Sequence, residues 1–227
     1  MRESRPAVPP LAAVAHELRT PLGGILGCAE LLAATPLDAD QRAHLDALRE
    51  AAAALSAFAD DAIELARLGD PAAHAAVRCR PSDVRAVLAG VARTLAPAAA
   101  RRGLTLTTHA AAHVPADACV DPDALRRILL NLGANAVRAT RRGGVRIVAD
   151  VEADRLLACT VADTGSGMTE ARRARLFRAW ATGGAEDGVG LGLVLAGELA
   201  ARMGGSLTAE STPGQGSTFT LCVPMRV

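Results

Sequence analysis

The chain has 227 residues, which is enough for one large domain or two modest ones. Its net charge is +1, with 25 basic and 24 acidic residues, so the charge does not indicate a polyanionic nucleic acid partner. Hydrophobic residues make up 50% of the sequence but aromatic residues only 2%, which predicts a core of Leu, Val, Ile and Ala.

The amino terminus and the cysteines indicate the compartment. The first ten residues, MRESRPAVPP, lack the apolar stretch of a signal peptide, and no apolar run approaches the ~20 residues of a membrane span. The five cysteines are scattered, without a CxxC pair or zinc-ligand spacing, and are expected to be small buried hydrophobes in a reducing cytosol. We expect a cytoplasmic chain; if it is the excised core of a longer protein, that protein can still be anchored in a membrane.

Two amphipathic helices are predicted at the amino-terminal end. The first begins after Pro9 and Pro10, because proline is tolerated at a helix start. Its apolar residues recur every three or four positions: Leu11, Val14, Leu18, Leu22, Ile25, Ala29 and Leu32. After a break at Thr35-Pro36, a second such stripe runs from Leu45 to Ala66. A lone helical hairpin cannot bury its apolar seam on both sides, so the sequence predicts a homodimeric four-helix bundle.

His16 is out of phase with the apolar stripe of the first helix and is expected to project toward solvent. Thr20 lies one turn further on the same face, and Glu17 is adjacent to the histidine. A single helical histidine is usually no more than a solvated surface residue. Pro21 weighs against that interpretation, because an interior proline costs ~3 kcal/mol and indicates a purposeful kink.

The composition changes over residues 70–76, where a domain boundary is predicted. A short strand is expected at 77–80, followed by a helix that is capped by Pro81-Ser82-Asp83 and runs to about Arg101. Further strands are expected at 104–108, 144–151 and 156–162, helices at 122–141, 169–177 and 190–203, and two strands at the end. Helices that alternate with an antiparallel or mixed sheet predict an α/β sandwich.

Asn131 and Asn135 are four residues apart and therefore lie on one face of the predicted helix 122–141. Their amide oxygens are ligands that Mg²⁺ accepts, and Arg138, one turn further, is placed to meet a phosphate. Paired asparagines on a helix also occur as caps or surface groups, so this cluster alone leaves both interpretations open.

Two glycine-rich segments follow. In the first, Asp163 ends an apolar strand and can accept a hydrogen bond from an exocyclic amine, while Gly165 and Gly167 let the backbone approach a flat ligand; a plain turn is equally compatible. The second, residues 188–193 (GVGLGL), opens a helix whose N–H groups and dipole favour an anion. Its spacing fits neither GxxxxGK(S/T) nor the Rossmann GxGxxG.

In order and spacing these motifs resemble the catalytic core of two-component sensor histidine kinases, from about Leu11 to Pro224. HELRTPL (16–22) is similar to the H box, LRRILLNLGANAV (125–137) to the N box, DTGSGM (163–168) to the G1 box, LFRAW (176–180) to the F box, and GVGLGL with GSTF (216–219) to the later glycine boxes. The resemblance implies a dimerisation and phosphotransfer hairpin over residues 1–70 and, over residues 77–227, a GHKL-type ATP-binding domain with a Bergerat-type α/β sandwich.

The resemblance implies that His16 is the phosphoacceptor and that Glu17 assists removal of its proton. The phosphoryl group would pass to an aspartate of a response-regulator receiver domain. The spacing from Glu17 to Thr20 resembles the ExxT pattern used to dephosphorylate that regulator. The chain has no recognisable sensor domain, so its signal is expected from an upstream sensor domain or protein.

The resemblance also assigns the nucleotide site. Asn135 would hold Mg²⁺ with Asn131 assisting, and Asp163 would read the adenine of ATP. Arg138 stands where the family often has a lysine. The remaining residues expected around ATP are Gly165, Gly167, Phe177, Gly188, Gly190, Gly192, Leu193 and Thr218.

One departure and two alternatives follow from the same motifs. The lid between Phe177 and Gly188 is short and has no basic residue after Arg178, which predicts few lid contacts to phosphate.

A non-kinase phosphotransfer or scaffold protein with a degenerate nucleotide domain is one alternative, but Asn135, Asp163 and the glycine pairs are intact. Another GHKL-type ATPase is the second, but the hairpin that carries a histidine has no role in such chemistry.

Overall fold

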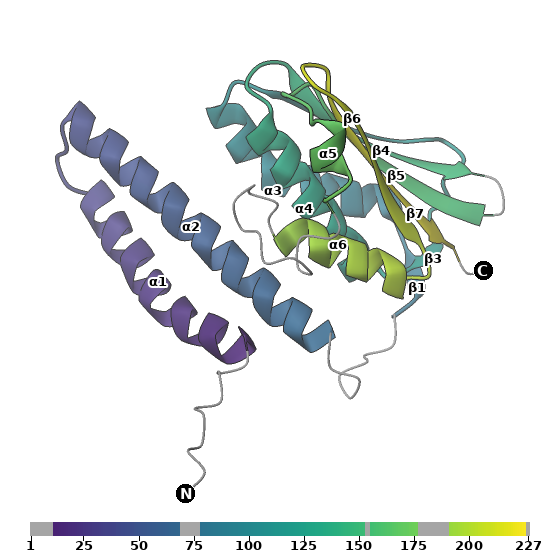
Figure 1. The fold of residues 1–227 in the computed structure, drawn as a ribbon, viewed down its shortest axis with the longest axis horizontal. Coiled ribbons are helices and arrows are strands. Elements are labelled where there is room, and N and C mark those ends of the chain that lie inside the picture. The colour runs from purple at the N-terminus through teal and green to yellow at the C-terminus, as the bar shows by residue number, and fades with distance from the viewer. Residues whose placement is uncertain (1–10, 69–77, 153–154, 177–190, 226–227) are drawn as a thin grey trace, which may run out of the picture. The chain divides into compact units, whose positions relative to one another are not determined.

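The computed structural model describes residues 11–68, 78–152, 155–176 and 191–225, with the backbone alone at 11–16 (Figure 1). It divides into two compact units, Met1–His74 and Ala75–Val227, and each unit is described by itself. None of the helices in these ranges is both long and apolar enough to cross a membrane.

The first unit is a helical hairpin of α1 (Leu11–Ala33) and α2 (Ala39–Leu68), as the apolar periodicity predicted (Figure 1). A reciprocal pair of hydrogen bonds starts α2: Gln41 N donates to Asp38 Oδ1 at 2.8 Å, and Asp38 N donates to Gln41 Oε1 at 3.1 Å. These bonds satisfy N–H groups that have no partner within the helix. The two helices bury Leu22 and Ala29 against a row of α2 residues, Leu45, Ala52, Ala59, Ala62 and Ile63.

A second apolar stripe on the hairpin stays exposed. On α1 it consists of Leu18, Ile25 and Leu32, each seven residues from the next, and they are 38%, 44% and 53% exposed. On α2 it continues with Leu48 and Leu55, again seven residues apart. A heptad repeat of large apolar residues is typical of a seam between helices, so one hairpin leaves this stripe without a partner among the described residues.

The second unit is an α/β sandwich, and the predicted fold class is confirmed. Its elements are β1 (Arg80–Ser82), α3 (Val84–Arg101), β2 (Thr105–Ala110), β3 (Ala118–Val120), α4 (Pro122–Ala139), β4 (Gly144–Glu152), β5 (Leu156–Asp163), α5 (Glu170–Arg173), α6 (Leu191–Arg202), β6 (Ser206–Thr212) and β7 (Gly216–Pro224). The main sheet has the order β2-β4-β5-β7-β6, with β2 parallel to β4 and the other pairs antiparallel. β1 and β3 form a separate antiparallel pair.

Helices α3, α4 and α6 cover one face of the sheet (Figure 1). Strand residues that point to this face are buried, such as Ile147, Val161 and Phe219, which follow one another across β4, β5 and β7. On β4, Arg146 and Asp150 alternate with the buried residues, point to the other face and are exposed. This alternation of period two decides which strand residues can reach the helices and which cannot.

The amino end of α4 is held by one carboxylate. Asp121 Oδ1 accepts hydrogen bonds from the backbone N–H groups of Asp123 and Ala124 at 3.1 and 3.0 Å, and Pro122 occupies the first turn. Asp121 Oδ2 also accepts a bond from Arg78 N at 3.0 Å. The cap of α4 therefore also anchors the segment through which the chain enters this unit.

Two predicted elements differ from the structure, and one short strand, β3, was not predicted. The strand expected at 77–80 lies instead at Arg80–Ser82, because its hydrogen-bonding partner is β3, a three-residue strand too short to show periodicity in the sequence. The helix expected at 169–177 ends at Arg173 within the described residues. α2 begins at Ala39, six residues before the predicted stripe starts at Leu45. The remaining elements for which limits were predicted begin and end within two residues of those limits.

Replacing Asp121 by Ala is expected to lower the free energy of unfolding by about 1–2 kcal/mol, because the cap and the bond to Arg78 are both lost. Asp123→Ala is the matched control, since this neighbouring carboxylate is exposed and only pairs with Arg80 at the surface. Its loss should cost less than about 1 kcal/mol. Urea unfolding measures both variants, and equal losses would show that Asp121 does not act as a cap.

Candidate functional site

A cavity of about 240 Å³ collects residues from five elements of the second unit. The lining comes from α4, from the end of β5 with the loop that follows it, from α5 and Leu176 just after it, from α6 and from β7. The lining residues are Asn135, Ala136, Arg138, Ala139, Asp163, Ser166, Gly167, Met168, Arg172, Leu176, Leu193, Ser217 and Phe219. A more open hollow of about 520 Å³ between α3 and the start of α4 contains none of the predicted site residues. The smaller cavity is therefore the candidate site.

Asp163 places a carboxylate in this cavity although the residue is only 8% exposed. Burial raises the pKa of Asp163 above its ordinary value of 3.8, and hydrogen bonds from the backbone of Gly165 and Ser217 oppose the shift. The bond from Gly165 N to Asp163 Oδ1 is 2.8 Å long. The carboxylate is thus fixed in orientation and presents a buried acceptor to a ligand.

Gly165 and Gly167 are required by contacts within the protein. A Cβ atom at Gly165 would lie 2.6 Å from the carbonyl oxygen of Ala139. Gly167 has φ +62°, and a Cβ atom there would overlap the carbonyl oxygen of Thr212. The sequence suggested that these glycines admit a ligand; in the structure they let the loop after β5 pack against α4 and against the β6–β7 turn.

Ser211 joins the same loop to β7. Its hydroxyl accepts a hydrogen bond from Met168 N at 2.8 Å and lies 2.9 Å from the carbonyl oxygen of Gly216, to which it donates. It also lies 3.0 Å from the hydroxyl of Ser217, which lines the cavity. The wall of the cavity that carries Asp163 is thereby linked to the wall that carries Ser217.

The polar face of α4 supplies further charged and amide groups. Arg138 donates a hydrogen bond to Asn135 Oδ1, and both side chains line the cavity. Asn131 does not line it; its Nδ2 donates to the carbonyl oxygen of Gly192 at 3.0 Å. Asn131 therefore ties α4 to the start of α6, which is a positioning contact.

The structure brings together five of the predicted nucleotide residues: Asn135, Arg138, Asp163, Gly167 and Leu193. It does not place four others in the cavity lining: Asn131, Gly165, Gly192 and Thr218. Phe177, Gly188 and Gly190 lie outside the described residues, as does the lid between them. On the hairpin, His16 lies within α1 with its side chain undescribed, while Glu17 and Thr20 are exposed.

Thr218 faces the wrong side of the sheet for the role that the resemblance implied. It pairs with Ala162, whereas the neighbouring Ser217 pairs with Asp163. Since consecutive strand residues point to opposite faces, Ser217 and Phe219 face the helices and line the cavity, and Thr218 cannot. The predicted residue is corrected by one position, to Ser217.

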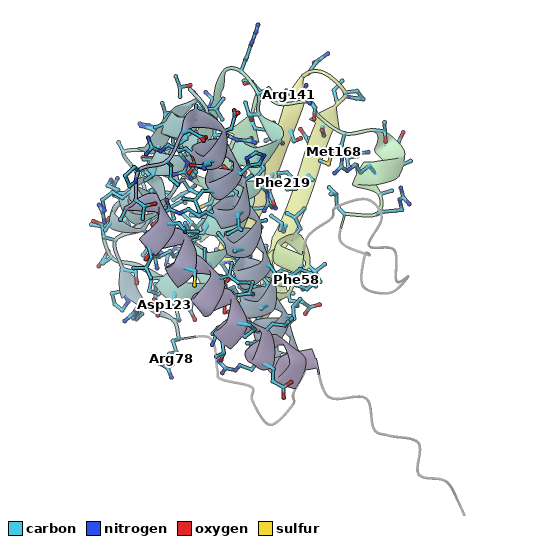
Figure 2. All side chains as sticks on the ribbon, turned by 90° about the vertical axis from the view of Figure 1, so that its left-hand side faces the viewer. Phe58, Arg78, Asp123, Arg141, Met168 and Phe219 are labelled. Carbon is cyan, nitrogen blue, oxygen red and sulfur yellow. The ribbon has the colours of Figure 1, made fainter. Side chains whose placement is uncertain are left out.

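Sequence reasoning also missed Met168, Arg172 and Phe219, which line the cavity. Figure 2 shows Met168 near the start of α5 and Phe219 on the sheet, and both line the cavity. Arg172 lies on α5 and adds a second cation beside Arg138. The signal was present in the sequence, as the cluster of arginines at 172, 173 and 175 just before LFRAW.

A charged contact crosses the hairpin one turn after His16. Arg19, one turn after the histidine, forms an ion pair with Asp60 of α2. Both side chains are about half exposed, so this pair contributes little to stability. It links the helix that carries His16 to α2.

Two family profiles match the chain. The His Kinase A (phospho-acceptor) domain matches residues 11–71, and HATPase_c, described as the histidine kinase-, DNA gyrase B- and HSP90-like ATPase, matches residues 120–227. The chain is 34% identical over 218 residues to the Sensor protein TorS of Escherichia coli K12, covering 96% of this chain and 24% of that protein. It is also 34% identical to the Signal transduction histidine-protein kinase BarA of the same strain, covering 92% of this chain. The chain thus spans about a quarter of the length of these relatives.

Solved structures have the same two-unit core. Full-length ShkA in complex with AMPPNP superposes with a TM-score of 0.74 at 37% identity, over 97% of this chain and 47% of ShkA. The histidine kinase AdeS of Acinetobacter baumannii superposes with a TM-score of 0.60 at 19% identity, over 93% of this chain and 98% of that one. The second likeness bears on the fold alone.

The raised pKa of Asp163 predicts a pH dependence of stability. Below pH 3.8 the carboxyl is protonated in both states; as pH rises through the raised pKa, its ionisation costs more in the folded protein than in the unfolded one. The free energy of unfolding of the wild type should therefore fall relative to that of Asp163→Asn between about pH 3.8 and pH 7. Urea unfolding of the two proteins across this range measures the difference. A difference that stays constant, or that changes in the opposite direction, would contradict the burial of the charge.

Proposed function

The chain belongs to the histidine kinases of two-component systems, of which it carries the phosphoacceptor and ATPase domains, and on that premise we propose that it phosphorylates His16 from ATP and passes the phosphoryl group to an aspartate of a response-regulator receiver domain. The observation that carries the proposal is the buried carboxylate of Asp163 in a cavity of the HATPase_c unit, with arginines at its edge. Such a reaction needs both a site that binds ATP and a histidine that accepts the phosphoryl group. The two domains that match this chain are of these two kinds.

The cavity suits a flat base with one amine. Asp163 offers a fixed acceptor to the exocyclic amine of adenine, and the apolar side chains of Met168, Leu193 and Phe219 line the surrounding surface. Arg138 and Arg172 place two positive charges at the same cavity, where phosphates would be neutralised. The complex of ShkA with AMPPNP supports a nucleotide as the ligand of this fold.

Mg²⁺ fits the donor set of this site. The described residues contain no group of three or more His, Cys, Asp or Glu side chains that could hold a metal ion by themselves. Mg²⁺ is usually held by one or two protein ligands together with substrate phosphates and water, and Asn135 supplies one amide oxygen at the cavity. Asn135 would hold the ion, whose charge would offset that of the phosphates when it is bound.

The chemical step requires a histidine nitrogen with a free electron pair. That nitrogen attacks the γ-phosphorus of ATP, the bond from this phosphorus to the bridging oxygen breaks, and ADP leaves. Glu17 follows His16 directly on α1 and is exposed, so its carboxylate can accept the proton that the ring gives up. Thr20, exposed one turn later, is the residue for which we propose a role in dephosphorylating the regulator.

We further propose that the hairpin forms a homodimer. Leu18, Ile25 and Leu32 on α1 and Leu48 and Leu55 on α2 leave a heptad stripe exposed, and a second copy would bury it in a four-helix bundle. The match to the His Kinase A domain supports this assembly.

Replacing Ile25 and Leu55 together by Glu should convert the dimer to a monomer, because four carboxylates would then be buried per interface. Light scattering coupled to gel filtration measures the mass. Leu31→Glu is the control, since Leu31 is 74% exposed and lies outside the heptad stripe. A double variant that remains dimeric while folded would remove the stripe from the interface.

Incubation with Mg²⁺ and ATP labelled at the γ-phosphate is expected to give an acid-labile, alkali-stable label on the wild type and none on His16→Ala.

Asp163→Asn should lower ATP affinity by about tenfold or more, because a lost hydrogen bond to a charged group costs about 1.5–3 kcal/mol. Calorimetric titration measures this affinity, and His16→Ala should retain it. Wild-type protein that binds ATP and stays unlabelled would contradict the kinase and favour a scaffold role; equal ATP affinity in Asp163→Asn would remove this residue from the site.

A further inference from the structure

Two cysteines that are 40 residues apart in sequence meet in the second unit. The sulfur atoms of Cys79 and Cys119 lie 2.6 Å apart, and both side chains are partly buried. Neither residue lines the cavity that contains Asp163. This contact was not visible in the sequence, where the two cysteines have no common motif.

The small sheet of β1 and β3 brings these cysteines together. In its antiparallel register Arg80 pairs with Val120 and Pro81 pairs with Cys119, so Cys79 lies directly before β1 and beside β3. Both backbones are held by this pairing and by the bond from Arg78 N to Asp121 Oδ2. The two sulfurs need to approach by only about 0.5–0.6 Å to reach the ~2.05 Å of a disulfide bond.

The other three cysteines have different surroundings. Cys28 is exposed on the hairpin. Cys159 is buried, and burial raises the pKa of its thiol to about 12, so it has almost no reactive thiolate. Burial also raises the pKa of Cys222. We expected all five cysteines to be buried hydrophobes, but only Cys159 is fully buried. Cys28 is exposed, and Cys79, Cys119 and Cys222 are only partly buried.

We propose that Cys79 and Cys119 form a reversible disulfide when the protein meets hydrogen peroxide, and that this pair is a redox modification site at the entry to the ATP-binding unit. The thiolate of one cysteine attacks a peroxide oxygen, the O–O bond breaks, and a sulfenic acid and, after protonation, one water form. The second thiol attacks the sulfenic sulfur, and a second water leaves as the disulfide forms. Two thiols and one peroxide thus give one disulfide and two waters, and a dithiol reductant reverses the oxidation.

The bond would act on the segment through which the chain enters the unit. Residues 80–82 are held to the rest of the unit through the short strand β3, and Arg78 is tied to the cap of α4, the helix that carries Asn135 and Arg138. Figure 2 shows Arg78 and Asp123 at this end of the unit. A covalent link there would close a loop that contains α3 and β2, and would stabilise the unit against local opening of its first strand.

The test uses the full chain with Cys28→Ser, which removes the exposed thiol that could cross-link two copies. After treatment with one equivalent of hydrogen peroxide, free thiols are alkylated and the protein is digested with trypsin without reductant. Trypsin does not cut between Arg80 and Pro81, so we expect peptides 79–85 and 103–126 joined, with a mass two hydrogens below their sum. Alkylated or sulfinic Cys79 and Cys119 without this joined peptide would overturn the proposal.

A thermal measurement supplies a second readout. Oxidation should raise the Tm of the ATP-binding unit by about 5–10 °C, and a dithiol reductant should reverse the rise. Cys79→Ser and Cys119→Ser should each abolish the rise, whereas Cys222→Ser, a partly buried cysteine outside the pair, should retain it. A rise that persists in the Cys79 and Cys119 variants would assign the effect to another site and would contradict the proposal.

Discussion

The buried carboxylate of Asp163 is the constraint on which the site depends. A carboxylate that is mostly removed from water is stable only with hydrogen-bond donors beside it, and the N–H groups of Gly165 and Ser217 are those donors. The first belongs to the loop after β5 and the second to β7, so the same interaction joins two walls of the cavity. The same loop packs against the backbone of Ala139 at Gly165 and against the backbone of Thr212 at Gly167, so neither position has room for a side chain.

Helix α4 connects this constraint to the proposed chemistry. Its apolar face is buried against the sheet and the neighbouring helices, including Leu125, Ile128, Leu129 and Leu132. Its polar face therefore points Asn135 and Arg138 into the cavity and Asn131 toward the start of α6. The proposed nucleotide site is therefore built partly on this helix, while the proposed phosphoacceptor lies on a separate hairpin. Each unit has its own core, so the two proposed roles lie on separately packed parts of the chain.

Most of the long elements and the motif residues could be predicted from the sequence. The prediction failed where the outcome depended on the face of a strand, on a very short strand or on contacts between distant segments. Thr218 and Ser217 are neighbours in one motif, and only pairing of β7 with β5 places Ser217 beside Asp163. β3 was missed because three residues show no periodicity. Arg172 was passed over because α5 and α4 are distant in sequence, although both line the cavity. The contact of Cys79 with Cys119 depends in the same way on the register of β1 and β3.

The sequence by itself determined the helical hairpin, the α/β class, the position of His16 on the first helix and the order of motifs by which the chain resembles the histidine kinases. Those features are local, because helix periodicity, caps and motif spacing are written in neighbouring residues. Only the tertiary structure decided that Gly165 and Gly167 serve packing, that Ser217 replaces Thr218 in the cavity, and that two distant cysteines touch. These features rest on strand register and on packing between distant segments, and a one-residue shift in register exchanges the two faces of a strand.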